Sequence, residues 1–364
     1  MIVDADAHVN EIEEIFSERY LDRPFQIRRP RIFRDERGRG YWMVEGSLIP
    51  KPTGRHCGVP EGFQGIGPKA TAPILGFSNR LKDMDREGIE VQVVYPTLML
   101  GAAQVEDKKL AAAMCRAYNR WLHDQCQVDP RRLRGVAVVP LQEPVAAVVE
   151  LRYAIRELNM IAVTVPGHSL GKSLHDEEFH PFFAAVQELD VPVGVHAVTG
   201  AYPAAGTDRF TNHLMGHIVG QPFEQMVAVV SVVCGGLMEL FPRLRWAFLE
   251  VGVGWVPYWV ERMDEHYEKH ELRHQLEEMA PYLKHRPSYY AKSGRCYWSP
   301  EVDEQELPHV IEVMGEDCLL FASDYPHGDS RWPDTVSTIM GRKDISESAK
   351  AKILGTNPQR FYGF

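Results

Sequence analysis

Short apolar runs alternate with longer amphipathic segments along most of the chain from residue 80 onward. The short runs end at polar residues, proline or glycine, which is typical of buried strands, whereas the longer segments repeat apolar residues at helical spacing. The predicted strands are Ile2–His8, Glu90–Tyr95, Gly135–Pro140, Ile161–Val165, Val191–His196, Arg245–Glu250, a weaker one in Tyr289–Tyr297, and Cys318–Ser323. The predicted helices are Arg80–Glu87, Lys108–Gln127, Val145–Leu158, Pro181–Leu189, Pro222–Leu240, Trp255–His270 and Pro308–Met314. This order predicts a parallel sheet with right-handed crossovers.

The number of predicted strands, about eight, favours a closed sheet, because eight parallel strands form a barrel more readily than an open sheet. We therefore predict an α/β fold, a distorted (β/α)8 TIM-like barrel that occupies residues 1–364 as a single domain. A doubly wound open sheet is the alternative, but no Gly-x-Gly-x-x-Gly pattern follows the first strand. Residues 10–80 interrupt the alternation with many Pro, Gly and Arg, and we expect them to form a lid-like insertion over the barrel mouth.

Composition limits the kind of protein and its partners. A chain of 364 residues with 45% hydrophobic content can bury a large core, and its net charge of −10 without a basic run argues against nucleic acid as a partner. The six cysteines form no Cys-x-x-Cys pair, and neither a signal peptide nor a membrane-spanning apolar run is evident. We expect a soluble, cytoplasmic protein that acts on a small molecule and not at a membrane.

Carboxylates and imidazoles stand on the first strand and at the ends of three others. On the first strand, strict alternation places Asp4, Asp6 and His8 on one face, where burial is costly unless the groups share a cation or a hydrogen-bond network. An exposed edge strand with solvated charges is the alternative. The other residues of this kind are His196, Glu250 and Asp324. Since the carboxyl ends of barrel strands meet at one rim, we expect these side chains to converge there.

Each of these residues, taken singly, also has a purely structural explanation. Asp324 could cap the turn at Tyr325-Pro326, and a histidine that ends an apolar strand is more often a hydrogen-bonded core residue than a ligand. Four or five such residues at corresponding strand ends are less readily explained by coincidence. An Asp-x-His pair on a strand suits zinc, manganese or iron.

Several segments together resemble the amidohydrolase superfamily, in the branch that includes aminocarboxymuconate-semialdehyde decarboxylase and the hydroxybenzoate decarboxylases. The matching segments are Asp4–His8, Val191–His196, Phe241–Pro257, Phe321–His327 and Ile353–Phe361. The resemblance implies one divalent ion, bound by Asp6, His8, His196 and Asp324. It also implies a homodimer, since relatives commonly form dimers.

Two positions depart from the pattern of the family that the chain resembles. Many relatives begin with His-x-His or Glu-x-His, so Asp6 adds a negative charge that favours manganese, iron or magnesium over zinc. Where the decarboxylases have a histidine that assists catalysis, this chain has Glu250, which is either catalytic or an anchor for the following Val-Gly-Val-Gly run. His217 or His213 could supply the missing imidazole.

These departures favour hydrolysis over decarboxylation as the expected reaction. We expect a metal-dependent hydrolase in which a metal-bound water attacks an amide, ester, thioester or carbon–carbon bond next to a carbonyl, with Asp324 as general base. The expected substrate is a small aromatic or cyclic carboxylic acid derivative. One alternative is a non-oxidative decarboxylase in which Asp324 protonates the substrate carbon, and another is a non-catalytic metal-binding protein. Aromatic residues that could wall the pocket are Trp42, Trp255, Tyr258, Tyr297 and Trp298, although aromatic residues are usually core.

Overall fold

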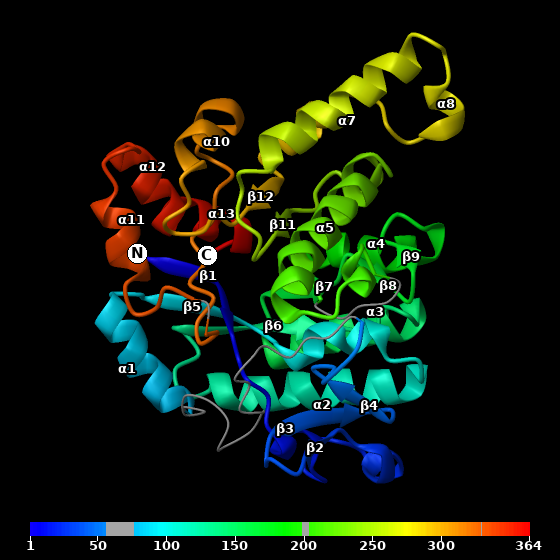
Figure 1. Cartoon of the computed structure of the whole chain (residues 1–364), viewed down its shortest axis with the longest axis vertical. Coiled ribbons are helices and arrows are strands. Elements are labelled where there is room, and N and C mark those ends of the chain that lie inside the picture. The colour runs from blue at the N-terminus through cyan, green and yellow to red at the C-terminus, as the bar shows by residue number, and fades with distance from the viewer. Residues whose placement is uncertain (56–75, 199–203, 329) are drawn as a thin grey trace.

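A computed structural model describes residues 1–55, 76–198, 204–328 and 330–364, and seven strands among them form one curved parallel sheet (Figure 1). The strands are β1 (Val3–His8), β5 (Val91–Tyr95), β6 (Leu133–Val138), β7 (Ala162–Val165), β10 (Val193–Val195), β11 (Trp246–Phe248) and β12 (Cys296–Trp298). They are hydrogen-bonded in that order, so that strands adjacent in this sheet follow one another along the chain. Sequential parallel neighbours are the arrangement expected of repeated βαβ units.

The segment 318–325 closes this sheet into a ring. Its first half bonds to β12, since the Leu320 amide donates to the Trp298 carbonyl at 2.9 Å. Its second half bonds to β1, through the Ala5 amide to the Phe321 carbonyl at 2.8 Å and the Asp324 amide to the Asp6 carbonyl at 3.0 Å. The predicted distorted (β/α)8 barrel is therefore confirmed.

The eighth position differs from the prediction in its regularity. The segment Cys318–Ser323 was predicted as a strand, but it forms only an isolated bridge between Leu319 and Trp298. The segment leaves β12 to pair with β1 and then turns at Asp324, whose φ of 54° lies in the left-handed region. A regular ladder cannot continue through such a turn.

Helices connect the strands and surround the sheet (Figure 1). The connecting helices are α1 (Phe77–Glu87), α2 (Lys108–Cys126), α3 (Pro144–Leu158), α4 (His180–Glu188), α5 (His213–Val233), α6 (Leu237–Leu240), α7 (Val256–Glu271), α8 (Leu276–Met279), α9 (Pro287–Ala291) and α10 (Leu307–Met314). The C-terminal part contains α11 (Thr335–Gly341), α12 (Glu347–Ala351) and α13 (Asn357–Tyr362). Local signals fix several ends: the Asp107 carboxylate accepts from two amides at the start of α2, and Gly88 ends α1 with φ 73°.

Two predicted elements have other bounds than expected. The helix predicted over Pro222–Leu240 is two helices in the structure. The first, α5, begins at His213 and ends at Val233, and α6 begins after Gly236, which has a φ of 81°. The weak strand predicted within Tyr289–Tyr297 is confined to β12, because Tyr289 to Ala291 belong to α9.

The described part of the predicted insertion forms a small antiparallel sheet beside α2 (Figure 1). Its strands are β2 (Arg31–Arg34), β3 (Gly40–Val44) and β4 (Ser47–Ile49), and a short pair, β8 (His168–Ser169) and β9 (Lys172–Ser173), follows β7. The short helix η1 (Glu13–Phe16) packs on α2, and the Phe16 and Trp42 rings meet edge to face at 5.8 Å. Residues 56–75 lie outside the described residues, so that a lid over the mouth stays a prediction.

Small residues on the strands make room for aromatic side chains inside the barrel. The Tyr95 hydroxyl lies 3.0 Å from that of Tyr362, which in turn donates to the Ala5 carbonyl at 2.6 Å. Gly194 faces the Tyr95 ring, which leaves no space there for a Cβ atom. No helix in the described parts of the chain combines the length and apolar character needed to cross a bilayer.

We expect Gly194→Ala to lower the free energy of unfolding by about 1–3 kcal/mol, because the new methyl group must displace the buried Tyr95 ring. Gly341→Ala is the matched control, since nothing lies within 4 Å of its Cβ position and its stability should change little. Denaturant unfolding of both variants checks this, and equal midpoints would contradict the packing described here.

Candidate active site and metal centre

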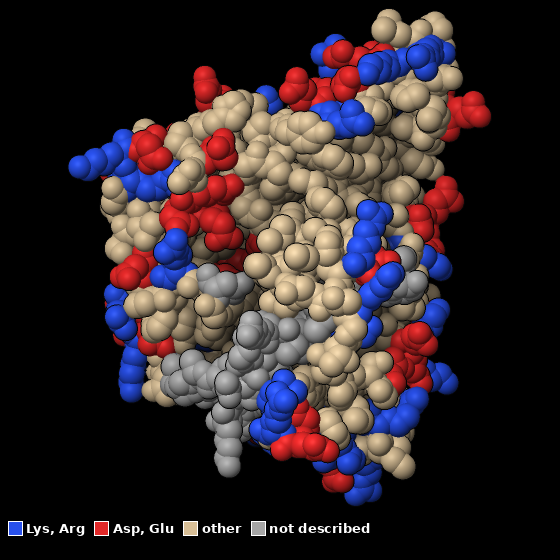
Figure 2. Space-filling view, viewed as in Figure 1, with Lys and Arg blue, Asp and Glu red and all other residues tan. Residues whose placement is uncertain are grey.

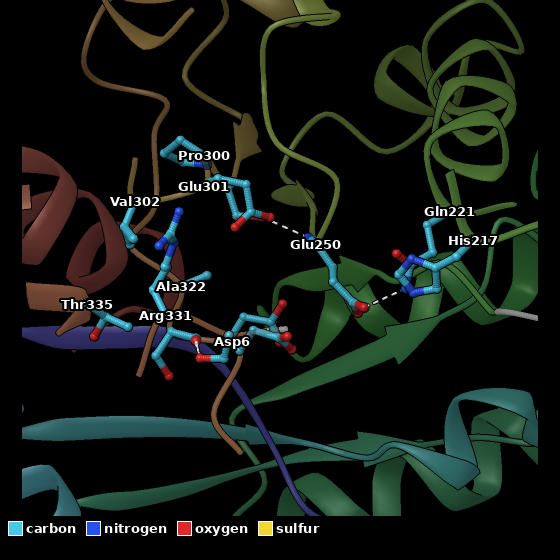
Figure 3. Close-up of a pocket in the computed structure, with 14 residues that line it drawn as sticks. Asp6, His217, Gln221, Glu250, Pro300, Glu301, Val302, Ala322, Arg331 and Thr335 are labelled. Atoms are coloured by element: carbon cyan, nitrogen blue, oxygen red, sulfur yellow. Dashed lines mark hydrogen bonds between the residues drawn. The ribbon is translucent and has the colours of Figure 1, made fainter. Parts of the chain in front are cut away.

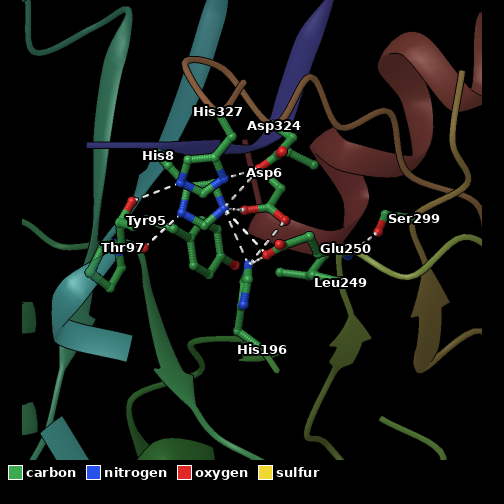
Figure 4. Close-up of polar contacts among 12 residues, drawn as sticks. Asp6, His8, Tyr95, Thr97, His196, Leu249, Glu250, Ser299, Asp324 and His327 are labelled. Carbon is green, nitrogen blue, oxygen red and sulfur yellow. Dashed lines mark hydrogen bonds and ion pairs between the residues drawn. The ribbon is translucent and has the colours of Figure 1, made fainter. Parts of the chain in front are cut away.

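Polar side chains from distant parts of the chain meet at the carboxyl ends of the barrel strands (Figure 4). Asp6 and His8 come from the end of β1, and Thr97 follows β5. The remaining members are His196 after β10, Glu250 after β11, and Asp324 and His327 after the closing segment. The predicted convergence at one rim is therefore present, and the alternative of an exposed first strand is wrong because every residue from Val3 to His8 is buried.

Two histidines and a carboxylate form the innermost group. The Nε2 atoms of His8 and His196 are 3.2 Å apart, and the Asp6 carboxylate lies 3.4 Å from His8 Nε2 and 3.7 Å from His196 Nε2. His8 Nδ1 is 2.7 Å from the Pro96 carbonyl and His196 Nδ1 is 3.1 Å from the Ala197 carbonyl, and a carbonyl can only accept. Both Nδ1 atoms therefore carry the hydrogen, and both Nε2 lone pairs face the centre.

This arrangement is unfavourable without a positive charge. All three side chains are at most 1% exposed, and neither Asp6 oxygen has a hydrogen-bond partner among the described residues. Burial raises the pKa of Asp6 well above its usual value and lowers that of His8 well below its usual value. One divalent ion among these atoms, which lie within 4.8 Å of one another, would compensate the carboxylate and use both lone pairs.

Glu250 is the next carboxylate outward. Its Oε2 lies 2.7 Å from His196 Nε2, Gln221 Nε2 donates to its Oε1 at 2.5 Å, and its backbone amide donates to Ser299 Oγ. Burial alone would lower the pKa of His196, but the Glu250 charge outweighs it and raises the pKa to about 10; in return, the pKa of Glu250 falls below its usual range. Glu250 thus favours a positive partner here, either a proton on His196 or a metal ion.

Asp324 is held by a histidine that the sequence analysis did not single out. His327 Nδ1 lies 2.7 Å from Asp324 Oδ1, and His327 Nε2 lies 2.9 Å from Thr97 Oγ1. The His327 ring stacks on His8 with centroids 4.2 Å apart. Asp324 Oδ1 is also 3.4 Å from His8 Nε2, so the predicted fourth ligand lies beside the inner group. The sequence signal for His327 was its place three residues after Asp324.

A buried network behind β1 fixes the turn that carries Asp324. The Asp4 carboxylate accepts from the Ser323 amide and hydroxyl at 2.9 and 2.5 Å, and from Gln92 Nε2 at 2.8 Å. Arg80 donates to Gln92 and to the His8 carbonyl. Burial raises the pKa of Asp4 to about 6 despite these hydrogen bonds. Asp4 therefore supports the site from behind.

A cavity of about 250 Å³ opens next to these groups (Figure 3). Its lining includes Asp6, Glu250 and Asp324 together with His217 and Gln221, which reach it from α5. Further lining residues come from the loop after β12 and from the turn after Asp324; they include Ser299, Glu301, Val302, Ser330 and Arg331. The predicted imidazole of His217 thus lies at the cavity, whereas His213 contacts the His217 ring at 5.2 Å.

The predicted aromatic wall is wrong for this cavity. None of Trp42, Trp255, Tyr258, Tyr297 and Trp298 is among the residues that line it. Trp42, Tyr297 and Trp298 are at most 2% exposed and belong to the core, while Tyr258 is 61% exposed on α7. Large aromatic side chains bury much apolar area and therefore lie in the core, whereas the cavity is lined by carboxylates and other polar groups together with the smaller Pro300, Val302 and Ala322.

Fold and site together define a metal-dependent barrel enzyme, and comparison with known proteins identifies its family. The sequence matches the amidohydrolase family over residues 3–364. The chain belongs to this family, as the resemblance predicted, and is an enzyme of the amidohydrolase superfamily that uses a divalent metal ion.

Similar proteins of known activity include several decarboxylases. The chain is 25% identical to 2-amino-3-carboxymuconate-6-semialdehyde decarboxylase of Dictyostelium discoideum over 78% of its length and 76% of the relative's. It is 28% identical to gamma-resorcylate decarboxylase of Rhizobium radiobacter, covering 78% and 86% of the two chains.

Solved structures of similar fold include one with a bound metal. A 5-carboxyvanillate decarboxylase from Novosphingobium aromaticivorans, complexed with manganese, is 26% identical with a TM-score of 0.67, covering 79% of this chain and 80% of that one. An amidohydrolase from Mycobacterium avium subsp. paratuberculosis has the same fold over 100% of this chain and 98% of its own, with a TM-score of 0.76 and 23% identity.

We expect Asp6→Asn to lower the metal content of the purified protein from about one ion per chain to well below half, because the amide removes one ligand charge while preserving shape. His266→Ala, which changes an exposed histidine on α7, should leave the metal content unchanged. Elemental analysis after dialysis measures both, and full metal occupancy in Asp6→Asn would refute this ligand assignment.

Proposed function

We propose that the protein is a metal-dependent, non-oxidative decarboxylase of a small hydroxylated aromatic or unsaturated carboxylic acid. The observation that carries the proposal is the position of Asp324, whose carboxylate borders both the inner metal-binding group and the cavity. The decarboxylases among the similar proteins support the same reaction class. A related solved structure is a 2,6-dihydroxybenzoate decarboxylase complexed with 2,6-dihydroxybenzoate, at 26% identity and a TM-score of 0.65.

The chain's own residues supply the binding geometry and the proton. A divalent ion bound by Asp6, His8 and His196 would attract the carboxylate and hydroxyl oxygens of such a substrate and withdraw electron density from it. Asp324, oriented by His327, would give its proton to the carbon that bears the carboxylate. The carbon–carbon bond then breaks, its electron pair restores the unsaturated system, and carbon dioxide leaves.

The position of Asp324 in this scheme is set by its neighbours. Its φ of 54° is uncommon for a residue with a side chain. The Asp4 network and the hydrogen bond from the Asp324 amide to the Asp6 carbonyl hold the backbone in this conformation. Thr97 fixes the far side of the His327 ring. The acid is therefore preorganised before substrate arrives, which is the condition for efficient proton transfer.

Glu250 supports a second candidate, hydrolysis. It stands where the decarboxylases that the chain resembles have a histidine. Its Oε2, which lies 2.7 Å from His196 Nε2, also faces the inner group at 3.9 Å from His8 Nε2. A carboxylate there could take a proton from an attacking water. In the decarboxylase, Glu250 would only hold His196 in place.

The proposal also includes a homodimeric state and a cytoplasmic location, neither of which distinguishes decarboxylation from hydrolysis.

We expect Asp324→Asn to lower the rate of carbon dioxide release from hydroxybenzoates by about 10²–10⁴-fold, the range typical of losing a general acid or base. Glu157→Gln, which changes an exposed residue on α3, should retain the full rate. The rate is measured as the release of labelled carbon dioxide from carboxyl-labelled acids by the manganese-loaded proteins. Absence of release from a panel of hydroxybenzoates and unsaturated acids by the wild-type protein would refute the proposal.

Glu250→Gln separates the two candidate reactions. If Glu250 only positions His196, the amide should reduce decarboxylation by less than about tenfold, since Gln can still accept from or donate to its neighbours. If Glu250 is the base of a hydrolase, turnover of ester or amide substrates should fall by about 10²-fold or more. Parallel assays with both substrate types and metal analysis of the variant distinguish these results.

A further inference from the structure

Glu301 is an acidic residue of the cavity that the proposed reaction does not use. It lies in the loop after β12 and is exposed at the rim, but its carboxylate points into the cavity (Figure 3). The packing around this carboxylate and the charge of Asp324 raise the pKa of Glu301 to about 7. The carboxylate is therefore largely ionised at pH 8.

The acidic residues that follow Glu301 in the same loop have partners. Glu304 accepts hydrogen bonds from the amides of Val253 and Gly254, and so anchors the loop after β11. Asp303 forms an ion pair with Arg331, which among the described lining residues is the one Lys or Arg. In contrast, no described residue donates a hydrogen bond to the Glu301 carboxylate or forms an ion pair with it. The charge of such a carboxylate is not compensated within the protein, so it interacts electrostatically with a ligand in the cavity.

The charge of the cavity is negative even with a metal ion in place. Asp6, Glu250, Glu301 and Asp324 all line it. In the proposed reaction Asp324 carries a proton, and one divalent ion compensates two of the three remaining charges. Arg331 forms its ion pair with Asp303, so one negative charge stays uncompensated. Figure 2 shows Asp and Glu side chains gathered at a hollow between the surface over α10 and α11 and the uncharged surface over α5. A substrate carboxylate at the metal ion is attracted, but a second anionic group toward the rim meets Glu301.

We propose that Glu301 determines specificity by excluding substrates with a second anionic group, so that the site accepts monocarboxylic acids whose remaining substituents are neutral or cationic. The proposal rests on the proposed function for the first carboxylate, which it places at the metal-binding group. The exclusion is electrostatic, because like charges brought together in a partly desolvated pocket repel strongly enough to select partners. The small cavity, about 250 Å³ against roughly 300–1,000 Å³ for drug-sized ligands, leaves little room for water to screen them.

The test is a binding measurement that does not require turnover. Manganese-loaded protein at pH 8 is titrated calorimetrically with 2-hydroxybenzoate and with a hydroxybenzene-dicarboxylate of the same ring. The wild-type protein should bind the monoacid at least about tenfold more tightly. Glu301→Gln should reduce this ratio to about threefold or less by gaining affinity for the diacid, with unchanged metal content. High salt should reduce the preference of the wild-type protein for the monoacid over the diacid, because salt screens the charge of Glu301. A purely structural role of Glu301 would not predict this change.

Glu312→Gln is the matched control, since it removes the same charge from a side chain of α10 that is 81% exposed. It should preserve the wild-type ratio. Equal binding of the two acids by the wild-type protein, no binding of either acid, or equal ratios in Glu301→Gln and Glu312→Gln would overturn the proposal. If the binding ratio is as expected but neither acid releases carbon dioxide, the proposed decarboxylation fails for these acids while the role of Glu301 stands.

Discussion

The central constraint on the structure is the burial of one carboxylate beside two inward-facing imidazole lone pairs, which a single cation would compensate. Asp6, His8 and His196 are each at most 1% exposed and face one another at 3.2–3.7 Å. Leaving a carboxylate in such surroundings without a partner costs several kcal/mol or more, which a divalent ion among these three side chains would offset. The ring of strands brings these residues together, and an ion bound among them would make their burial favourable.

The same centre explains why two residues with side chains adopt left-handed backbone conformations. Asp324 and Glu250 have φ values of 54° and 69°, and each points its carboxylate toward the histidines. The hydrogen bonds of Asp4 and of Ser299 hold the backbone at these two turns. Local strain of this kind persists where the surroundings over-determine it, and here it brings the side chains that the proposed chemistry requires to the cavity.

Much of the fold and the inner site could be predicted from the sequence because both leave local patterns. Alternation on β1 and the apolar runs before His196 and Glu250 predict strands, and parallel strands bring their carboxyl ends to one rim. The closing segment 318–325 was harder, since it shares its hydrogen bonds between two strands and never becomes a regular ladder. The aromatic wall was predicted wrongly because a tryptophan or tyrosine has the same sequence signal in a core as in a pocket.

Long-range contacts around the site could not be predicted from the sequence. His327 with Thr97, and Gln221 with Glu250, meet across long stretches of chain, and no spacing rule connects them. The decarboxylases among the relatives also shift the favoured reaction from hydrolysis, which the sequence favoured through Glu250, to decarboxylation. Reaction type depends on how a few atoms lie around the cavity, and periodicity along the chain does not report it.

The most direct test of the central claim is the thermal stability of the protein with and without its metal ion. Removing the ion with a chelator at pH 8 should lower the melting temperature by several degrees, and adding back manganese should restore it, because the ion binds only the folded site. A melting temperature that is unchanged by chelation, in protein shown by elemental analysis to have lost its metal, would contradict the account.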